Sequence, residues 1–351
     1  MESDSNPVGS SASISLQPTL RHRQEVSPSV GKGTASQSKL SNSTIETVEA
    51  MRLPNEIETI DETLPYNIHK CPPEIPDGYP RQWSIIDVLS HWNPDDMNIP
   101  NKIYQGFCEI DWSNAEEREI AEKYREAEMP FVVRNHPTTW ETAERWGKWK
   151  GFVPPTDNVK LTFDQWYDKS LEVETLEDPI HTEHYYFRLN ADYRKEEKND
   201  WVFEDLPFFY PKKNFFFVEP DDYRGINCRL GAKGIIAHAH YDFSRNFILL
   251  LKGQKRYILA HPNQCTNLEL YPPGHPSARH SSVNWSNQTE WQQGNFPRAH
   301  VNEVIMQAGD IMYLPTAWFH FIVSLNMNYQ CNSRSGITNE NYGTIEDCGF
   351  M

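Results

Sequence analysis

Three residues of the chain have the types and spacing of a metal site. His240 and Asp242 lie two positions apart, at the head of an apolar and β-prone run. Because successive strand residues face opposite sides, these two side chains are predicted to share one face. The candidate third ligand is His320, in the segment W-F-H-F-I-V-S-L. Two imidazoles and one carboxylate leave three octahedral positions open, as in non-haem Fe(II) oxygenases, whereas zinc usually takes four ligands.

The H-x-D pattern alone is weak evidence, because a chain with 13 histidines is expected to contain about one chance match. Lys255 adds to it. It follows the Gly253 turn and is predicted to begin a return strand that points its ammonium group inward, where a lysine needs an anionic partner. Asn246 and Asn332 could help to orient a small dicarboxylate.

Simpler interpretations stand beside each of these. Lys255 could be a solvent-facing turn charge, like its neighbours Lys252 and Arg256. His320 could be a polar residue at a strand edge. The two asparagines could be hydrogen-bonded core amides.

Short strands are the elements that would position these residues. Strand-like runs lie near 226–230, 235–240, 247–251, 256–260, 304–306, 311–314, 320–325 and 329–331. They are separated by turn signals rather than helices, which favours a sandwich or barrel. The strand-poor segment 265–300 is predicted to be an insertion over the barrel mouth. Upstream, the patterns predict helices over 83–92, 114–127 and 161–171 and strands over 129–134 and 184–189.

Composition divides the chain into four parts. Residues 1–55 are rich in Ser, Thr, Gln and Pro and nearly free of aromatics, so this segment is predicted to be disordered. Residues 56–128 are predicted to form a helical part that packs on the barrel. Residues 129–340 form the predicted catalytic domain, and 341–351 a short tail.

Charge and cysteine usage restrict the partners and the compartment. The chain has 33 basic and 49 acidic residues, a formal net charge of −16, which disfavours nucleic-acid binding and leaves room for a basic protein or peptide substrate. The six cysteines form no C-x-x-C pair, and most of them are predicted to be reduced, packed thiols. We find no membrane-spanning run and no secretory signal, so we expect a cytoplasmic or nuclear protein and no membrane contact.

Five motifs, taken together and in this order, resemble a known family. They are H-Y-D-x-x-x-N-F, K-G-x-K-R-x-I-L, Y-P-P-G-H-P, A-G-D-I-M-Y-L-P and W-F-H-x-I-x-S-L. From about residue 129 to 336 the chain resembles the JmjC-domain Fe(II)/2-oxoglutarate-dependent oxygenases of the cupin superfamily. It is most similar to the small protein-hydroxylase branch, typified by the hypoxia-inducible factor asparaginyl hydroxylase. The resemblance implies a mainly β fold with surrounding helices, built on a double-stranded β-helix (jelly-roll) barrel.

The resemblance also implies a ligand set of Fe(II), 2-oxoglutarate and O2. Iron is expected on His240, Asp242 and His320. The far carboxylate of 2-oxoglutarate is expected on Lys255, with Tyr186 as a hydroxyl that assists it. Asn246 and Asn332 are expected near the iron-proximal end of the cosubstrate.

The chain departs from that branch in several places. Ala237 stands where the hydroxylase has a hydroxyl residue, so the cosubstrate contacts must differ. His238 is predicted to share the face of His240, either on the substrate side of the mouth or as an ordinary strand histidine. The chain ends soon after the last strand, so the C-terminal helices by which that enzyme dimerises are not expected, and the oligomeric state is left open.

The first hypothesis is therefore a 2-oxoglutarate-dependent dioxygenase that hydroxylates a side chain of a protein. If the target carbon is an N-methyl group, the same chemistry gives a JmjC N-methyl-lysine (histone) demethylase. The rival hypothesis from another class is a non-catalytic cupin-like binding protein. Such a protein is expected to lose a metal ligand or the lysine, and this chain keeps all four residues.

Overall fold

A computed structural model describes most of the chain. It covers residues 23–26, 57–60, 63–147, 162–177, 179, 182, 184–191, 201–210, 212, 214–216, 219 and 223–348. The segment predicted to be disordered, 1–55, lies outside these residues apart from Arg23–Val26, which form strand β1. The predicted tail begins inside a helix, α7 (Asn339–Asp347).

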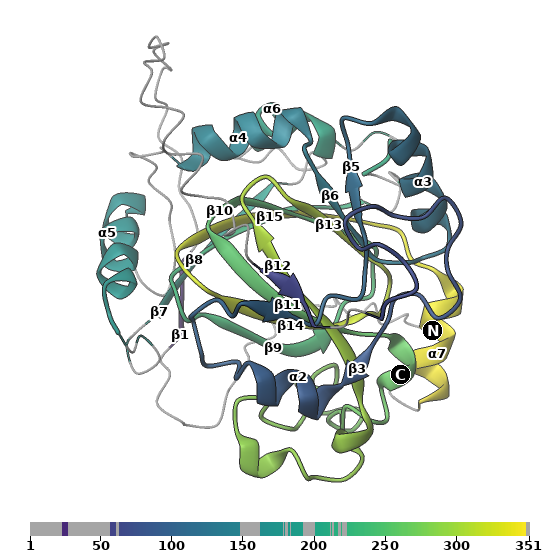
Figure 1. The fold of residues 1–351 in the computed structure, drawn as a ribbon. Helices are drawn as coiled ribbons and strands as arrows, with labels where there is room; N and C mark the ends of the chain where they lie inside the picture. Colours follow the sequence, from purple (N-terminus) through teal and green to yellow (C-terminus); the bar gives the residue numbers. More distant parts are fainter. Residues whose placement is uncertain are drawn as a thin grey trace, which may run out of the picture.

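Two β-sheets form the barrel at the centre of Figure 1. The larger sheet has the order β1 (Arg23–Val26), β7 (His184–Ala191), β8 (Tyr223–Gly231), β15 (Asn328–Ser335), β10 (Asn246–Lys252), β13 (Ile311–Leu314), β6 (Phe131–Arg134) and β5 (Glu109–Asp111). The smaller sheet has the order β3 (Trp83–Ser84), β12 (His300–Gln307), β11 (Gln254–Ala260), β14 (Phe319–Ser324) and β9 (Ile236–Tyr241). Strands β2 (Glu58–Thr59) and β4 (Lys102–Ile103) pair separately. The predicted mainly β barrel is confirmed.

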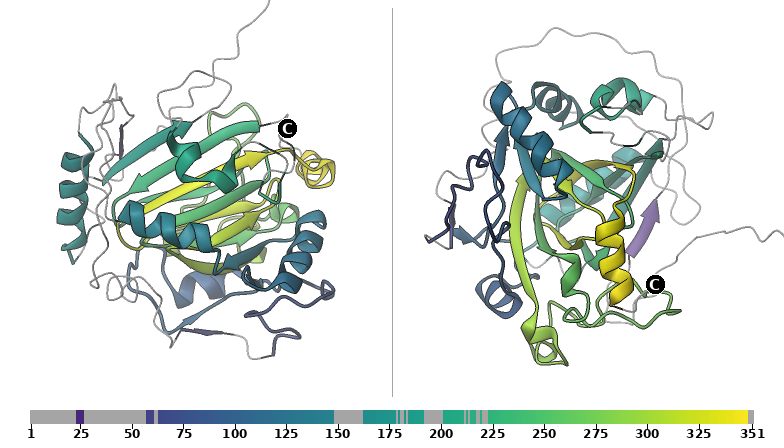
Figure 2. Two further views of the ribbon diagram at one scale, coloured as in Figure 1. Left: turned by 90° about the horizontal axis from the view of Figure 1, so that it is seen from above. Right: turned by 90° about the vertical axis from the view of Figure 1, so that its right-hand side faces the viewer.

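Helices cover the barrel from outside, as the views in Figures 1 and 2 show. They are α2 (Ile85–His91), α3 (Ala115–Glu126), α4 (Pro137–Gly147), α5 (Phe163–Glu174), α6 (Trp201–Asp205) and α7. A capping box opens α5: the Thr162 hydroxyl accepts from the Gln165 backbone N–H, and the Gln165 side chain accepts from the Thr162 N–H. Among the described residues, no helix has the length and apolarity to span a membrane.

The turn at Gly253 connects the two sheets. Lys255 does follow it on a new strand, but β11 pairs with β12 and β14 and does not pair with β10. The predicted new strand at Lys255 is present, but it does not return along β10, because the chain crosses from one sheet to the other at this turn. Gly253 has a φ of +76°, and a Cβ there would lie 2.3 Å from the Met327 carbonyl oxygen, so only glycine fits.

The segment 265–300 packs mainly on the outer face of the smaller sheet. Its Trp285 ring stacks on Phe321 of β14, with centroids 5.1 Å apart. Only a short part of the segment reaches the barrel edge, where Ser281 N–H donates to the Ala239 carbonyl and His280 forms a bridge with His240. The predicted insertion therefore extends the edge of β9 beside the candidate ligands.

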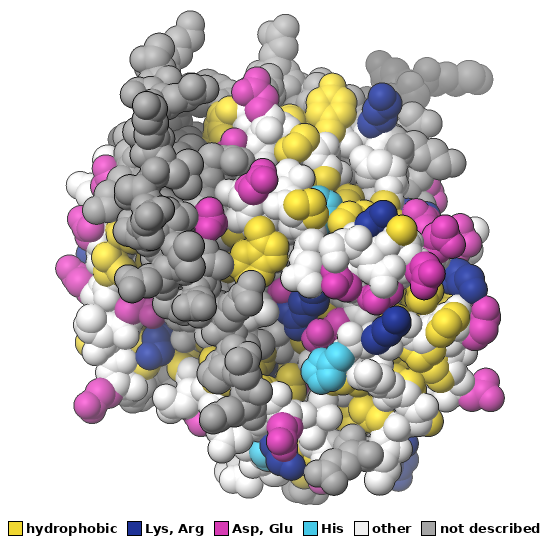
Figure 3. All heavy atoms as spheres, turned by 45° about the horizontal axis from the view of Figure 1, so that its top comes forward, with side chains coloured by type: hydrophobic (Ala, Val, Ile, Leu, Met, Phe, Trp, Pro, Cys, Tyr) yellow, Lys and Arg dark blue, Asp and Glu magenta, His cyan; other side chains and the backbone are white. Residues whose placement is uncertain are grey.

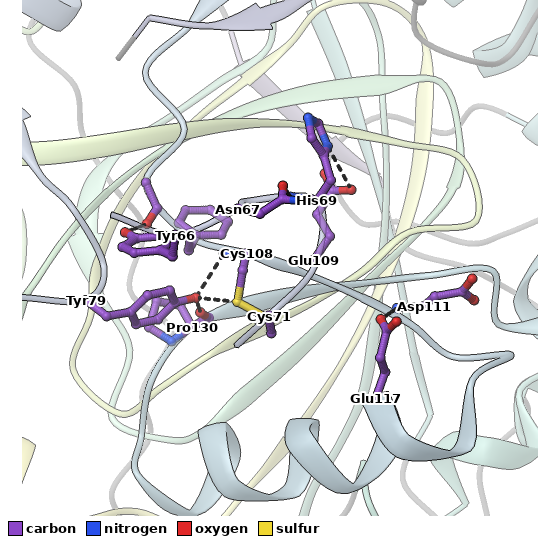
Figure 4. Close-up of a disulfide and its surroundings, with 12 residues drawn as sticks. Tyr66, Asn67, His69, Cys71, Tyr79, Cys108, Glu109, Asp111, Glu117 and Pro130 are labelled. Atoms are coloured by element: carbon purple, nitrogen blue, oxygen red, sulfur yellow. Dashed lines mark hydrogen bonds and ion pairs between the residues drawn. A yellow bond between two sulfur atoms is a disulfide. The ribbon is translucent and has the colours of Figure 1, made fainter. Parts of the chain in front are cut away.

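All six cysteines are paired, so the prediction of reduced thiols is wrong. The disulfides are Cys71–Cys108, Cys228–Cys331 and Cys265–Cys348. The partners are separated by 37, 103 and 83 residues, so no local spacing pattern announces them. Figure 4 shows the first pair beside Tyr79, whose hydroxyl donates to the Pro130 carbonyl.

Candidate metal centre

The structure brings the three predicted ligands together. His240 on β9 and His320 on β14 are direct partners across the two strands, and Asp242 follows the end of β9. The two imidazole centroids lie 4.3 Å apart, and His320 Nε2 lies 3.9 Å from Asp242 Oδ2. One ligand atom from each of the three residues lies within 4.8 Å of the others. The strand pairing thus supplies the common face that the sequence predicts.

Backbone hydrogen bonds orient both imidazoles. His240 Nδ1 donates to the His238 carbonyl at 2.7 Å, and His320 Nδ1 donates to the Trp318 carbonyl at 3.1 Å. A carbonyl oxygen only accepts, so each Nδ1 carries the proton. The Nε2 lone pairs are therefore left for a metal ion.

The electrostatics suit the same purpose. Burial holds the pKa of His240 and of His320 below the usual histidine value, so both rings are neutral at pH 7. Burial alone would raise the pKa of Asp242, but the positive charge of Arg334 beside it outweighs that effect and holds the pKa below the usual range. Two neutral imidazoles and one ionised carboxylate are the donor set that a divalent transition-metal ion requires.

A β-bulge separates His238 from this site. In regular pairing Ile322 would lie opposite His238, but it lies opposite Ala237 instead. The extra residue turns the His238 ring toward Phe321, 6.0 Å away, on the outer side of the sheet. The expectation that His238 shares the face of His240 is therefore wrong. Ala237 is the inward-facing residue.

Arginines that the sequence interpretation missed surround Asp242. Arg334 donates to Asp242 Oδ2 at 2.5 Å, and an Arg279 nitrogen lies 3.5 Å from Oδ1. His280, next to Arg279, stacks on His240 with centroids 5.1 Å apart. Arg279 and His280 come from the insertion, whose contact with β9 no short-range pattern announces.

Lys255 lies inside the barrel and is 3% exposed. Its Nζ donates to Gln330 Oε1 at 2.8 Å, and the Tyr257 hydroxyl donates to the same oxygen at 2.6 Å. Lys255 and Tyr257 alternate on β11, whereas Gln330 belongs to β15 in the opposite sheet, so both bonds cross the interior. The alternative of a solvent-facing Lys255 is therefore excluded.

The hydroxyl that meets Lys255 at Gln330 is that of Tyr257. Tyr186, the residue expected to assist Lys255, is buried on β7 and lies under the guanidinium groups of Arg188 and Arg229, each 5.9 Å from its ring centroid. Tyr186 therefore borders this cluster, and its assignment as the assisting hydroxyl stays a prediction.

A row of polar side chains on β15 joins the lysine to the metal centre. Gln330, Asn332 and Arg334 alternate along the strand and share one face. Gln330 meets Lys255, Asn332 donates to Asn246 Oδ1 at 3.0 Å, and Arg334 meets Asp242. The period-two pattern Q-x-N-x-R is a signal in the sequence that would have found Gln330 and Arg334.

Comparison with known proteins identifies the fold family. The sequence profile of the cupin-like domain family matches residues 156–338, just over half of the chain. The chain belongs to the cupin-like family. It carries both metal-ligand strands and Lys255 inside the matched region.

Curated relatives of this cupin-like chain include a JmjC domain-containing protein, tRNA wybutosine-synthesizing proteins and lysine-specific demethylases. It is 31% identical over 104 residues to the JmjC domain-containing protein D of Dictyostelium discoideum, covering 30% of the chain and 23% of the relative. It is 28% identical over 186 residues to the tRNA wybutosine-synthesizing protein 5 of Danio rerio, covering 52% and 54%. It is 26% identical over 132 residues to a lysine-specific demethylase of Arabidopsis thaliana, covering 34% and 24%. The matched regions span about half of these relatives or less. The branch within the family stays a prediction.

Proposed function

We propose that this protein is an Fe(II)- and 2-oxoglutarate-dependent dioxygenase that hydroxylates a side chain of a protein substrate. The observation that carries the proposal is the convergence of His240, Asp242 and His320 with their Nε2 and carboxylate donors aimed at one point. The Lys255–Tyr257–Gln330 cluster supports it, because it offers a buried ammonium and a hydroxyl to a carboxylate at the other end of the polar row.

The reaction divides between the iron and the protein. When bound, iron supplies the redox chemistry by which 2-oxoglutarate, O2 and a C–H group give succinate, CO2 and a C–OH group. His240, Asp242 and His320 hold the ion on one side and leave the other side open. Lys255 anchors the cosubstrate. The barrel wall keeps water from the reacting carbon.

Two lines of support concern the substrate. On the face in Figure 3, acidic and basic side chains of the described residues are intermingled and form no basic surface, and the net charge is −16. Both disfavour binding along a phosphate backbone and favour a protein substrate. Relatives named as lysine-specific demethylases fit the same preference and keep N-methyl-lysine oxidation as an alternative.

A second candidate substrate is tRNA. Four relatives named tRNA wybutosine-synthesizing protein 5 match 40–52% of the chain, which is a longer share than the demethylases match. An enzyme that acts on one exposed base needs fewer phosphate contacts than a protein that tracks a nucleic-acid strand.

Turnover of 2-oxoglutarate tests the proposal. Iron-loaded wild type is expected to form succinate with a peptide digest of a cell extract, and His240→Ala is expected to lose both metal binding and turnover. His238→Ala is the matched control, because its ring lies two positions away but on the outer face. We expect it to retain both properties.

Three results would count against the proposal. Equal turnover by wild type and His240→Ala, or none by iron-loaded wild type with peptides and with total tRNA, would exclude the enzyme and favour a binding protein. Turnover with tRNA alone would replace the protein substrate by a nucleic acid. Mass spectrometry of the product would then separate addition of one oxygen from loss of a methylene group.

A further inference from the structure

Arg279 lies on the solvent side of the metal centre. It belongs to the insertion, and its side chain is 38% exposed, whereas that of Asp242 is 10% exposed. Two hydrogen bonds fix it to Tyr241, the last residue of β9. The Tyr241 N–H donates to the Arg279 carbonyl, and Arg279 Nη1 donates to the Tyr241 carbonyl at 2.9 Å. Arg279 therefore borders the metal ligands where a substrate can approach them.

The guanidinium of Arg279 is held in place and keeps donors for a ligand. It lies against the Phe243 ring, with Cζ 5.4 Å from the ring centroid. Among the residues that the structure describes, its one carboxylate neighbour is Asp242, whose Oδ1 lies 3.5 Å from Nη1. Both polar contacts of the side chain thus use the same nitrogen. The N–H groups on Nε and Nη2 donate to no described residue.

Asp242 is a weak counter-charge for this guanidinium. Its Oδ2 accepts from Arg334, and the metal ion of the proposed function needs an oxygen of the same carboxylate. The 3.5 Å separation from Arg279 is also longer than the roughly 2.7–2.9 Å typical of a charged hydrogen bond. The net charge of −16 is screened beyond about 8 Å in physiological salt, so the local positive charge at Arg279 decides which side chain fits here.

Resting on the proposed function, we propose that Arg279 binds a carboxylate of the protein substrate, and that the side chain to be hydroxylated is an aspartate or a glutamate. The fork of a guanidinium matches both oxygens of a carboxylate. Hydroxylation places one atom of O2 in a C–H bond next to the held carboxylate. The other oxygen atom enters succinate as 2-oxoglutarate loses CO2. Arg279 is a substrate-binding residue and is separate from Lys255, which is buried in the barrel interior.

The short distance between Arg279 and the metal ligands indicates that the held carboxylate belongs to the target side chain itself. Arg279 Nη1 lies 3.5 Å from an oxygen of Asp242. In an extended peptide, side chains on the same side are two residues or about 6.6 Å apart, which would carry a neighbouring carboxylate past the guanidinium. The carbon next to a carboxylate is only one bond, about 1.5 Å, away from it.

Product analysis tests the substrate class. A tryptic digest of a cell extract is incubated with iron-loaded wild type, 2-oxoglutarate and O2, and peptides that gain one oxygen are sequenced by mass spectrometry. The same reaction with His240→Ala gives the background of uncatalysed oxidation. The added oxygen is expected on aspartate or glutamate.

A peptide found in this way is then synthesised with its acidic target residue and, separately, with the corresponding amide. In calorimetric titration of the protein loaded with nickel and 2-oxoglutarate, wild type is expected to bind the acidic peptide about 10- to 100-fold more tightly, the range typical of a hydrogen bond to a charged group. Arg279→Met is expected to bind both peptides equally weakly, and Arg279→Lys to recover part of the difference. Arg298→Met is the matched control, because Arg298 is exposed on the same insertion but precedes β12, three strands from β9. We expect it to discriminate like wild type.

The Kd values for nickel and for 2-oxoglutarate separate substrate binding from a positioning role. In Arg279→Met both are expected to stay within about threefold of wild type, because the 3.5 Å contact with Asp242 is weak. A loss of nickel affinity with unchanged discrimination between the two peptides would mean that Arg279 only orients Asp242, and it would overturn the proposal.

The remaining outcomes separate this proposal from the proposed function. If iron-loaded wild type turns over no 2-oxoglutarate with peptides or with total tRNA, the proposed function fails and the role of Arg279 falls with it. If the added oxygen lies on neutral or basic side chains, or if lysine loses N-methyl groups, the dioxygenase stands and the acidic target is refuted. Turnover with tRNA alone also refutes it, since the guanidinium would then meet a phosphate.

Discussion

His136 is a buried histidine in an aromatic environment away from the metal centre. It is 7% exposed, and the rings of Trp112, Phe208 and Phe216 lie 5.2–5.5 Å from its own. Its Nδ1 is buried without a hydrogen-bond partner among the described residues. Burial lowers the pKa of His136 to about 4, so the native state holds the ring neutral.

His136 is expected to make the free energy of unfolding depend on pH. In the unfolded chain a histidine titrates near pH 6.5, so the unfolded state binds the extra proton first as the pH falls. Stability is therefore lost between about pH 6.5 and 4, and at pH 5 the loss from this residue is about 2 kcal/mol. In His136→Phe, urea unfolding is expected to show a smaller loss between pH 8 and 5 than in wild type. His91→Phe, on the surface, is the control. An unchanged loss in His136→Phe would contradict this.

At the scale of the elements, a buried ion pair of Arg256 connects strand β11 to its neighbours. The sequence allowed a solvent-facing turn charge, but the side chain is fully buried and paired with Glu303 of the neighbouring strand β12. Its Nε donates to Glu303 at 2.8 Å, and another guanidinium nitrogen donates to the Trp92 carbonyl at 2.7 Å. The ion pair thus joins β11 to β12, and the hydrogen bond to Trp92 ties the end of α2 to the smaller sheet.

Removing one member of this pair is expected to be costly. Arg256→Met leaves the Glu303 carboxylate buried without its cation, which typically costs about 3–5 kcal/mol. The double variant Arg256→Met with Glu303→Met is expected to recover part of that loss, because it removes the uncompensated charge. Urea unfolding of wild type and the variants measures both effects. A single variant within about 0.5 kcal/mol of wild type would rule out this role.

The elements were largely predictable because their signals are local. Short strand-like runs between turn signals mark each of the strands β8 to β15, and the spacing of His240 and Asp242 places both on one face of a single strand. The bulge at Ala237 and the change of sheet at Gly253 were missed, since both depend on which strand lies alongside. The orientation of His238 was predicted wrongly because it depends on the strand register at this bulge.

At the scale of the molecule, the disulfides connect distant parts of the chain. Cys71–Cys108 fastens the N-terminal part to β5, and Cys265–Cys348 joins the insertion to the end of α7. Cys228–Cys331 crosses from β8 to β15, the pair of strands that carries Arg229 and Gln330. Disulfides persist in oxidising compartments, so these pairs favour such a compartment. The cytoplasmic or nuclear location expected from the sequence stays a prediction.

The bond between β8 and β15 is expected to stabilise the barrel. Replacing Cys228 and Cys331 together by valine keeps the buried pair apolar but removes the cross-link, at an expected cost of about 2–5 kcal/mol. Peptide mapping without reductant checks the pairing, and urea unfolding measures the loss. Dithiothreitol is expected to destabilise wild type more than the variant. Wild type that contains free thiols and ignores the reductant would contradict the pairing.

The long-range contacts of the site escaped prediction for the same reason as the disulfides. Arg279 and His280 reach the metal centre from an insertion whose docking depends on the folded sheet. Strand pairing likewise places Arg229 directly opposite Gln330, although the two residues are about a hundred positions apart in the chain. Residue spacing therefore located the metal ligands, and only the pairing of strands located what surrounds them.

The paired cysteines and a ferrous ion make opposite demands on the surroundings of this protein. The iron of the proposed function would have to be returned to the ferrous state whenever it is oxidised, while the three sulfur bridges have to stay oxidised. A thiol such as glutathione acts on both, because its thiolate attacks disulfides. A reductant that transfers single electrons, such as ascorbate, restores the metal and leaves the bridges closed. The protein is therefore expected to remain active longest where ascorbate is plentiful and thiols are scarce.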